Sequence, residues 1–536
     1  INELIQKRRL LEAFASIRLM EDETLSEWGS EKYSNNPQEI VRKSKDVDLL
    51  YNSITNAIHS IVEGTLEDPT LEHTMLTSMV TLIAREEAAH PNTDSAARRG
   101  SDLLGRPRKW REQWREAVKE SARKRVLKAP MASREEATSW LDLHLNFLQE
   151  HLREDLLKIK LSVKKCYPEE YQVCDTYVEA FHNAIASHLQ ELSQGLLDFH
   201  ELYTLLSWVA NTYHSEFFLG HPDLKPEVKT ENLSLLLTPA DWDKLKNDYI
   251  ASAKGKIKSY FGNILRLEIT EKWEKREKEV HSEEEENLYH ASLSFDIQMI
   301  IGQHVKLSGA ISRSLETKML ELCMAELLEF IPRFEQEFMA WSTAQDRPIF
   351  VPYLVAYINS FHDLVSGLET AFKANTEELQ KILAALTRNF TNIFLTKLRT
   401  KAQPLLKKIL TKNWVLAMER PDSLALAISQ FSEHLQHIRA PLGQELLHEV
   451  HKYVVKEYIT QVIKPRWKMN RETRQQVSRK MSLEAAIIHD TLIDQGSNAD
   501  WLLPAIDHIA NIIGEKKKYK IKAHVKELCR DYRDVR

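Results

Sequence analysis

The sequence predicts an all-α fold, an elongated rod of stacked antiparallel helical bundles. Gly (14) and Pro (17) together make up under 6% of the 536 residues, about half of the usual share. So few turn-forming residues disfavour strand-rich and α/β folds. Apolar residues recur at every third or fourth position along most of the chain, and the polar breaks between these stretches are short. Long helices joined by short links form bundles.

The composition is that of a chain with well-formed cores, since 43% of the residues are hydrophobic and 28% are charged. Polar, turn-rich stretches such as GHPDLKPEVKTENLS indicate where the bundles divide. We expect the rod to be on the order of 100 Å long. We predict four helical bundles, over residues 1–130, 131–232, 233–375 and 376–536.

The most regular helical pattern begins at Thr238. Thr238 is a typical N-cap residue, and Pro239 suits the first helical position. Apolar residues then follow at steps of three or four, which predicts one buried stripe. The stripe consists of Trp242, Leu245, Tyr249, Ala253, Ile257, Phe261 and Ile264. A similar stripe from Thr376 to Leu398 consists of Leu379, Ile382, Leu386, Phe390 and Ile393.

The segment 106–128 combines tryptophans with many basic residues. Trp110, Trp114, Val118 and Leu127 mark one face, and nine Lys and Arg residues surround it. A basic amphipathic helix can lie on an anionic membrane or enter a partner's groove. We favour a core helix whose long basic side chains cover its outer face.

The C-terminal part of the chain is strongly basic although the net charge of the whole chain is −5. Residues 452–480 hold nine Lys and Arg against two acids, and residues 515–536 hold nine against four. Within 516–536, Ile521, Val525, Leu528 and Tyr532 should form a face that docks on the bundle. A ridge about 100° around the helix should carry the cations at positions 518, 522, 526, 530 and 533.

Sequence patterns of catalysis are lacking. There is no glycine-rich nucleotide-binding pattern and no GxSxG. HEVH at 448–451 resembles a zincin motif but lacks the spacing that brings two imidazoles to one metal. We therefore predict a protein that is not an enzyme and that needs no cofactor and no metal. Four sparse cysteines fit a reducing cytosol, and no apolar run approaches the ~18 residues of a membrane span.

The stretch LLSWVANTYHSEFFLGHPDL (205–224) resembles an element of the exocyst component three (Sec-six) family. That element reads W-[VL]-x-N-x-Y-x-S-E, then a polar break and a helix similar to LLTPADWDKLKNDYI (235–250). The resemblance covers nearly the whole chain. The matching residues are Trp208, Val209, Asn211, Tyr213, Ser215 and Glu216.

The resemblance implies a rod of the exocyst, or tethering-complex, type that acts as a non-catalytic tether or scaffold in membrane traffic. Such a protein is expected in the cytoplasm, peripheral to the plasma membrane. Within the family the chain is most similar to the branch that tumour necrosis factor induces. That branch implies a role in membrane protrusions and tunnelling nanotubes, with exocyst subunits and a Ral-type small GTPase as partners. It also implies a basic N-terminal segment that contacts phosphoinositide in an anionic membrane, and we expect this segment to be missing before Ile1.

The resemblance further implies that the GTPase binds toward the C-terminal bundle, where the basic residues lie. Because Ral-type GTPases present acidic effector surfaces, we predict that the basic C-terminal surface is the partner-binding site. A solvated surface, direct binding of anionic lipid through the basic amphipathic helices, and a helical adaptor without a GTPase are the alternatives. Nucleic acid is not expected, since aromatic residues for base stacking are few there. The predicted residues are Arg466, Lys468, Arg471, Arg474, Lys516, Lys517, Lys518, Lys520, Lys522, Lys526 and Arg530.

Overall fold

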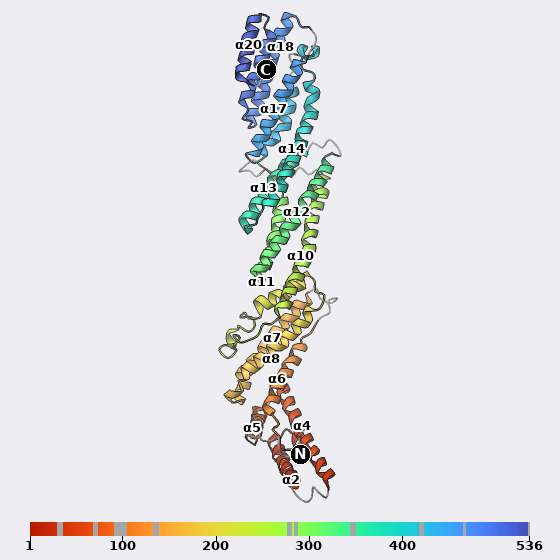
Figure 1. Cartoon of the computed structure of the whole chain (residues 1–536), viewed down its shortest axis with the longest axis vertical. Helices are drawn as coiled ribbons and strands as arrows, with labels where there is room; N and C mark the ends of the chain where they lie inside the picture. Colours follow the sequence, from red (N-terminus) through yellow and green to blue (C-terminus); the bar gives the residue numbers. More distant parts are fainter. Residues whose placement is uncertain are drawn as a thin grey trace. The chain divides into compact units, whose positions relative to one another are not determined.

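The structure, a computed structural model, confirms the all-α fold class (Figure 1). Helices account for nearly all of the regular structure among the described residues, and two-residue strands β1 (His281–Ser282) and β2 (Tyr289–His290) form one antiparallel pair. The structure describes residues 1–28, 36–67, 73–89, 104–131, 139–275, 281–282, 288–343, 350–417, 423–464 and 468–533.

The chain folds into two compact units. Unit 1 comprises residues 1–253 and 308–315, and unit 2 comprises residues 254–307 and 316–536. Helices α10 (Pro239–Leu267), α11 (Leu293–Ile311) and α12 (Arg313–Thr343) contribute residues to both units. The division into four bundles and the end-to-end rod stay predictions.

Unit 1 is built from helices of unequal length. Its long helix α4 places an isoleucine or valine on its inner side at nearly every turn, which buries one continuous stripe. The α-helices are α1 (Asn2–Gln6), α2 (Leu10–Trp28), α4 (Pro37–Glu67), α5 (His73–Ala89), α6 (Trp110–Leu127), α7 (Trp140–Leu161), α8 (Val173–Ser193) and α9 (Phe199–Ser207). The short helical segments are η2 (Val163–Cys166), η3 (Glu169–Tyr171), η4 (Trp208–Thr212) and η5 (Pro222–Leu224).

Unit 2 holds the rest of the helices and ends with the C-terminal basic segment. The helices of its C-terminal half are drawn from green to blue in Figure 1. The α-helices that lie wholly in it are α13 (Phe350–Phe372), α14 (Glu377–Leu406), α15 (Lys412–Leu416), α16 (Ser423–Ser432), α17 (Leu442–Ile463), α18 (Arg471–Asp494), α19 (Leu503–Gly514) and α20 (Lys518–Asp531). The short segments are η6 (Glu268–Trp273), η7 (Glu433–His437) and η8 (Asp500–Leu502).

Helix α10 begins and packs as its sequence predicts. The Thr238 hydroxyl accepts the backbone N–H of Asp241 at 3.1 Å and donates to its carboxylate at 2.6 Å, which caps the helix. Six of the seven residues in the predicted stripe are buried, and only Trp242 is half-exposed.

Helix α14 follows its predicted stripe with one shift. Leu379, Leu386 and Phe390 are buried as predicted, but Ile382 and Ile393 are half-exposed. The residues that follow these two, Leu383 and Phe394, are the buried ones. The shift arises because a straight helix of 3.6 residues per turn drifts relative to a pattern of threes and fours.

Candidate partner-binding surface

The basic C-terminal surface is built from the ends of two helices in unit 2. Helix α19 packs against both α18 and α20. At the end of α19, Gly514 approaches the Ser478 side chain of α18 so closely that a Cβ on the glycine would lie 2.7 Å from the hydroxyl oxygen. The chain then turns into α20, so the N-terminal parts of α18 and of α20 both lie near this end of α19. Figure 1 labels the two helices in the same part of unit 2.

The corner between α19 and α20 is fixed by Glu515. Its carboxylate accepts the backbone N–H groups of Lys516 and Lys517 at 2.8 and 2.9 Å. These two backbone hydrogen bonds lower the pKa of the Glu515 carboxyl below its ordinary value. The corner therefore holds the first lysines of the cluster in a defined place on the surface.

Every predicted partner-binding residue that the structure describes is exposed to solvent. Arg466 lies outside the described residues. Two of the other ten form ion pairs: Lys520 lies 3.9 Å from the Glu515 carboxylate, and Arg530 lies 3.1 Å from Asp531. The remaining eight have no carboxylate within 4 Å among the described residues, and we call them the unpaired basic surface. They are Lys468, Arg471, Arg474, Lys516, Lys517, Lys518, Lys522 and Lys526.

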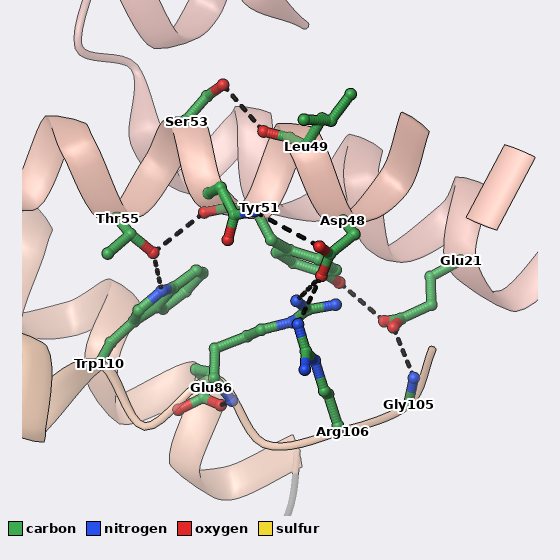
Figure 2. Close-up of polar contacts among 12 residues, drawn as sticks. Glu21, Asp48, Leu49, Tyr51, Ser53, Thr55, Glu86, Gly105, Arg106 and Trp110 are labelled. Carbon is green, nitrogen blue, oxygen red and sulfur yellow. Dashed lines mark hydrogen bonds and ion pairs between the residues drawn. The ribbon is translucent and has the colours of Figure 1, made fainter. Parts of the chain in front are cut away.

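The basic segment 106–128 in unit 1 has the opposite arrangement. Figure 2 shows Arg106 directed at Asp48, beside the buried Tyr51 and Trp110, and Arg108 pairs with the same carboxylate. Each of the other pairs also joins a cation of this segment to a carboxylate of unit 1. They are Lys109–Glu112, Arg111–Glu87, Arg111–Glu170, Lys119–Glu116, Arg123–Glu120, Lys124–Glu63, Arg125–Asp155 and Lys128–Glu67.

Helix α6 is therefore a core helix whose charges are mostly neutralised by its own unit. Trp110, Trp114 and Val118 are fully buried, as predicted. Leu127 is wrong as a face residue, since it is 55% exposed and Val126 is buried in its place. Helices α6 and α20 are both basic and amphipathic in sequence, but most cations of α6 are paired with carboxylates and most of those on α20 are not.

The apolar face of α20 is less buried than predicted. No side chain of α20 is buried: Ile521 and Leu528 are half-exposed and Val525 is 40% exposed. The physical reason is that α20 packs mainly on one neighbour, α19. Its C-terminal end is held by the Asp531–His508 ion pair at 3.0 Å and by a hydrogen bond from the Tyr532 hydroxyl to the Trp501 carbonyl.

The predicted partner-binding residues do not include Tyr519, an aromatic residue of the basic segment. Tyr519 is 65% exposed, and Lys522 and Lys526 lie three and seven residues further along α20. Residues at these spacings share one helix face. The spacing of Tyr519 from Lys522 and Lys526 could have identified it from the sequence as a residue of the same helix face.

The HEVH stretch at 448–451 lies on α17 and does not form a metal site in the described part of the chain, where no group of three or more His, Cys, Asp or Glu side chains is placed to hold an ion. His451 is buried, and its Nδ1 lies 3.0 Å from the Ser497 hydroxyl. Burial, aided by the neighbouring His489 and His448, lowers the pKa of His451 to about 4, and Asp500 opposes this shift.

This buried histidine predicts an acid-sensitive region around α17. Between its ordinary pKa of 6.5 and about 4, the unfolded chain binds a proton at His451 and the folded chain does not. The stability that depends on neutral His451 is therefore full above pH 6.5 and falls as the pH drops toward 4, by about 3 kcal/mol. We expect hydrogen exchange of α17 to accelerate over this range, and less so in His451→Gln. The same change at the exposed His362 should have no effect, and equal acid sensitivity of both variants would contradict the assignment.

All four cysteines are free thiols, with Cys529 on α20 exposed and the other three buried. Over the described residues, none of the helices combines the length and the apolar character that crossing a bilayer requires.

Comparison with known proteins decides the family. The exocyst complex component Sec6 family matches residues 44–536, which is nearly the whole chain. The chain belongs to the exocyst Sec6 family. This membership makes it a scaffold or tethering protein of the exocyst type.

Two relatives and one solved structure agree with this assignment. The chain is 25% identical to tumor necrosis factor alpha-induced protein 2 of Homo sapiens, over 93% of this chain and 75% of that protein. It is 23% identical to the exocyst complex component 3-like protein of Danio rerio, over 99% and 72%. The crystal structure of M-Sec shares the fold, with a TM-score of 0.69, 24% identity and coverage of 99% of this chain and 91% of that one. The predicted likeness to the branch induced by tumour necrosis factor is confirmed.

The element that carries the family resemblance is a packing motif of this exocyst Sec6 family member. Trp208 and Tyr213 are buried, and the Tyr213 hydroxyl lies 2.8 Å from Nδ1 of the buried His182. The Asn211 side-chain amide donates to the Ala310 carbonyl at 2.8 Å, within unit 1. These residues hold the fold of unit 1 and are separate from the unpaired basic surface, which lies in unit 2.

Proposed function

We propose that this exocyst Sec6 family protein binds a Ral-type small GTPase through the unpaired basic surface of unit 2. The observation that carries the proposal is the set of eight exposed cations without carboxylate partners among the described residues. Most cations of α6, by contrast, pair with carboxylates of their own unit. An acidic effector surface would supply the missing negative charge.

The cations of the unpaired basic surface and the neighbouring Tyr519 would contribute to binding in different ways. Complementary charge mainly accelerates encounter and sets orientation, and the affinity comes from a few desolvated anchors. Tyr519 is the aromatic side chain best exposed on α20, and tyrosine is enriched among such anchors. We therefore assign the charge complementarity to the lysines and arginines and the anchoring contact to Tyr519.

Charge reversal tests the proposal. The triple variant Lys517→Glu, Lys518→Glu, Lys522→Glu should reduce binding of the GTP-loaded GTPase at least tenfold, with unchanged helical circular dichroism. The matched control is Arg388→Glu, Lys407→Glu, Lys408→Glu, which changes the net charge equally at three exposed residues of α14 and its end. Binding that survives the first triple, or that falls equally in both, would remove the basic surface from the proposal.

The anchor role of Tyr519 gives a separate prediction. Tyr519→Ala should weaken the same complex by about tenfold or more, mainly through faster dissociation, and raising the salt concentration should not abolish the difference. Tyr260→Ala, at a tyrosine of α10 that is 38% exposed, should leave binding unchanged. An effect of Tyr519→Ala confined to the association rate would argue against an anchor.

Direct binding of anionic lipid is the second candidate, favoured by the exposed Val525 beside unpaired lysines on an amphipathic helix. Each such cation contributes about 1 kcal/mol near an anionic bilayer. Sedimentation with vesicles of neutral lipid, with and without phosphoinositide, distinguishes it from the GTPase. Binding to phosphoinositide vesicles without any GTPase, lost in the charge-reversed triple, would favour lipid.

The proposal extends to a wider role in the cell. We propose that the protein links the GTPase to exocyst subunits at the cytoplasmic side of the plasma membrane, and that it supports membrane protrusions such as tunnelling nanotubes. Its likeness to tumor necrosis factor alpha-induced protein 2 supports this placement. Co-purification from cells with the GTPase locked in its GTP or GDP form should recover exocyst subunits only in the GTP form. A helical adaptor without a GTPase would recover them in both.

A further inference from the structure

Unit 2 carries an exposed tryptophan that the unpaired basic surface does not include. Trp501 of η8 is 52% exposed, whereas every other tryptophan that the structure describes is buried or half-buried. Its indole therefore offers apolar area that another molecule can cover. Because tryptophan is enriched among the anchor residues of protein interfaces, Trp501 marks a candidate contact surface.

Two further rings flank the exposed indole. The centroid of the His448 ring, on α17, lies 6.5 Å from that of Trp501, and the centroid of the Tyr532 ring lies 6.4 Å from it. The Tyr532 hydroxyl also donates to the Trp501 carbonyl, which ties the end of α20 to η8. Three segments that are separate in the sequence thus form one aromatic surface.

Asp500, directly before Trp501, adds a negative charge next to the indole. Its side chain is 82% exposed and has no lysine or arginine within 4 Å among the described residues. Its carboxylate lies 3.8 Å from Nε2 of His489, and a histidine neutralises a carboxylate only when the imidazole is protonated. The carboxylate is therefore available to a cation from another molecule.

A second carboxylate, that of Asp507 on α19, lies on the Tyr532 side of this surface. Asp507 is half-exposed and, over the described residues, pairs with no lysine or arginine. Burial raises the pKa of the Tyr532 hydroxyl, and the nearby carboxylates of Asp531 and Asp507 add to this rise. Asp531 already pairs with Arg530 at 3.1 Å, so Asp500 and Asp507 carry the negative charge that the surface still presents.

An exposed indole beside unpaired carboxylates has the chemistry of a cation site. The face of a ring attracts a cation through its quadrupole, and a carboxylate attracts it through a full charge. Arginine suits both groups better than lysine does, because its planar guanidinium stacks on aromatic rings and binds carboxylates through two hydrogen bonds. We propose that this surface binds an arginine on a basic segment of a partner protein. The Trp501 surface consists of His448, Asp500, Trp501, Asp507 and Tyr532.

The exposure of the Trp501 surface favours an arginine that belongs to a longer partner. Small-molecule sites usually bury most of their ligand, whereas the indole and the Asp500 carboxylate stand largely in solvent. A free cation would gain few contacts at such a place, but a peptide segment adds contacts on both sides of the arginine. The exposed carboxylates also repel acidic partners and anionic lipid.

The Trp501 surface is distinct from the proposed GTPase site. Helix α20 begins with the unpaired Lys518 and ends just before Tyr532. Its 14 residues span about 21 Å at a rise of 1.5 Å per residue. The two ends of this helix thus present opposite charges, and they should recruit partners of opposite charge.

Binding of a short Gly/Ser peptide that carries paired arginines tests the proposal. Fluorescence anisotropy of the labelled peptide with the full chain should show binding that weakens about tenfold in Trp501→Ala. Trp501→Phe should lose less, because phenylalanine keeps a smaller ring face. The control is Trp242→Ala, at a half-exposed tryptophan of α10, which should leave binding unchanged. The same peptide with lysine in place of arginine should bind more weakly than the arginine peptide.

The carboxylates have their own readout. The double variant Asp500→Asn, Asp507→Asn should weaken binding of the arginine peptide and reduce its dependence on salt. The matched control is Glu321→Gln, Glu377→Gln, which neutralises two exposed carboxylates of α12 and α14 and should change neither.

Several results would overturn the proposal. They are a wild-type chain that does not bind the arginine peptide, an equal loss in Trp501→Ala and Trp242→Ala, and equal binding of the lysine peptide. Self-association of the wild-type chain in sedimentation velocity, abolished by Trp501→Ala, would assign the surface to a second copy instead. Trp501→Ala should leave binding of the GTPase unchanged, so this surface is tested independently of the proposed function.

Discussion

Trp273→Ala is expected to lower the free energy of unfolding of unit 2 by about 3–5 kcal/mol. Trp273 is fully buried, and its ring centroid lies 5.4 Å from that of Phe338 and 5.6 Å from that of Trp341. Its indole N–H donates to the Tyr357 hydroxyl at 2.7 Å, and that hydroxyl donates to the buried Glu268 carboxylate at 2.5 Å. Alanine would leave a large cavity and remove one hydrogen bond from this buried chain.

Native-state hydrogen exchange of α12 and α13 measures this effect, because both helices contribute residues to the aromatic cluster. Trp501→Ala is the matched control, since Trp501 is 52% exposed and its removal should cost well under 1 kcal/mol. Equal acceleration of exchange in the two variants would mean that Trp273 is not a centre of the core of unit 2.

The helical fold could be predicted because periodicity reports burial directly. In α10 the predicted stripe and the observed core agree at six positions, and Thr238 caps the helix as its residue type indicates. Long amphipathic helices give many repeats of the same signal. The all-α fold therefore follows from the sequence. The element around Trp208 also allowed the family to be predicted.

Local irregularities could not be predicted from the same periodicity. The segments Trp208–Thr212 and Glu268–Trp273 are π-helical, with one extra residue in a turn. An extra residue rotates the following side chains around the helix axis, which ends the register that a 3.6-residue pattern assumes. Trp273 lies at the end of such a segment, where helical periodicity does not predict which side chains are buried.

The sequence could identify the basic residues of the candidate site, but it could not show which of them pair with a carboxylate of the same chain. Arg106 and Lys518 are both basic residues of amphipathic segments, yet Arg106 pairs with Asp48, 58 positions away, and Lys518 has no described carboxylate partner. Pairing between distant positions is a property of tertiary packing that the local sequence does not encode. A groove between α13, α14 and residues 438–442 could not be predicted from the sequence either, because three separate segments line it.

Asp155→Ala should destabilise unit 1 by about 3–5 kcal/mol. Asp155 of α7 is fully buried, and both of its carboxylate oxygens accept hydrogen bonds from the Arg125 guanidinium of α6 at 2.8 Å. Removing the carboxylate leaves the cation of Arg125 largely buried without its partner. It also leaves the Lys158 ammonium, which lies 3.9 Å from Asp155, without that carboxylate.

The double variant Arg125→Met, Asp155→Leu distinguishes the charge from the packing. Because it removes both members of the pair and fills similar volume, it should recover most of the stability lost in Asp155→Ala. Urea unfolding, monitored by hydrogen exchange of α6 and α7, measures the stability of both variants. The control is Glu120→Ala, which breaks the exposed pair with Arg123 on α6 and should cost less than 1 kcal/mol. If the double variant is as unstable as the single one, the bidentate pair contributes a specific geometry to unit 1 that apolar packing cannot replace.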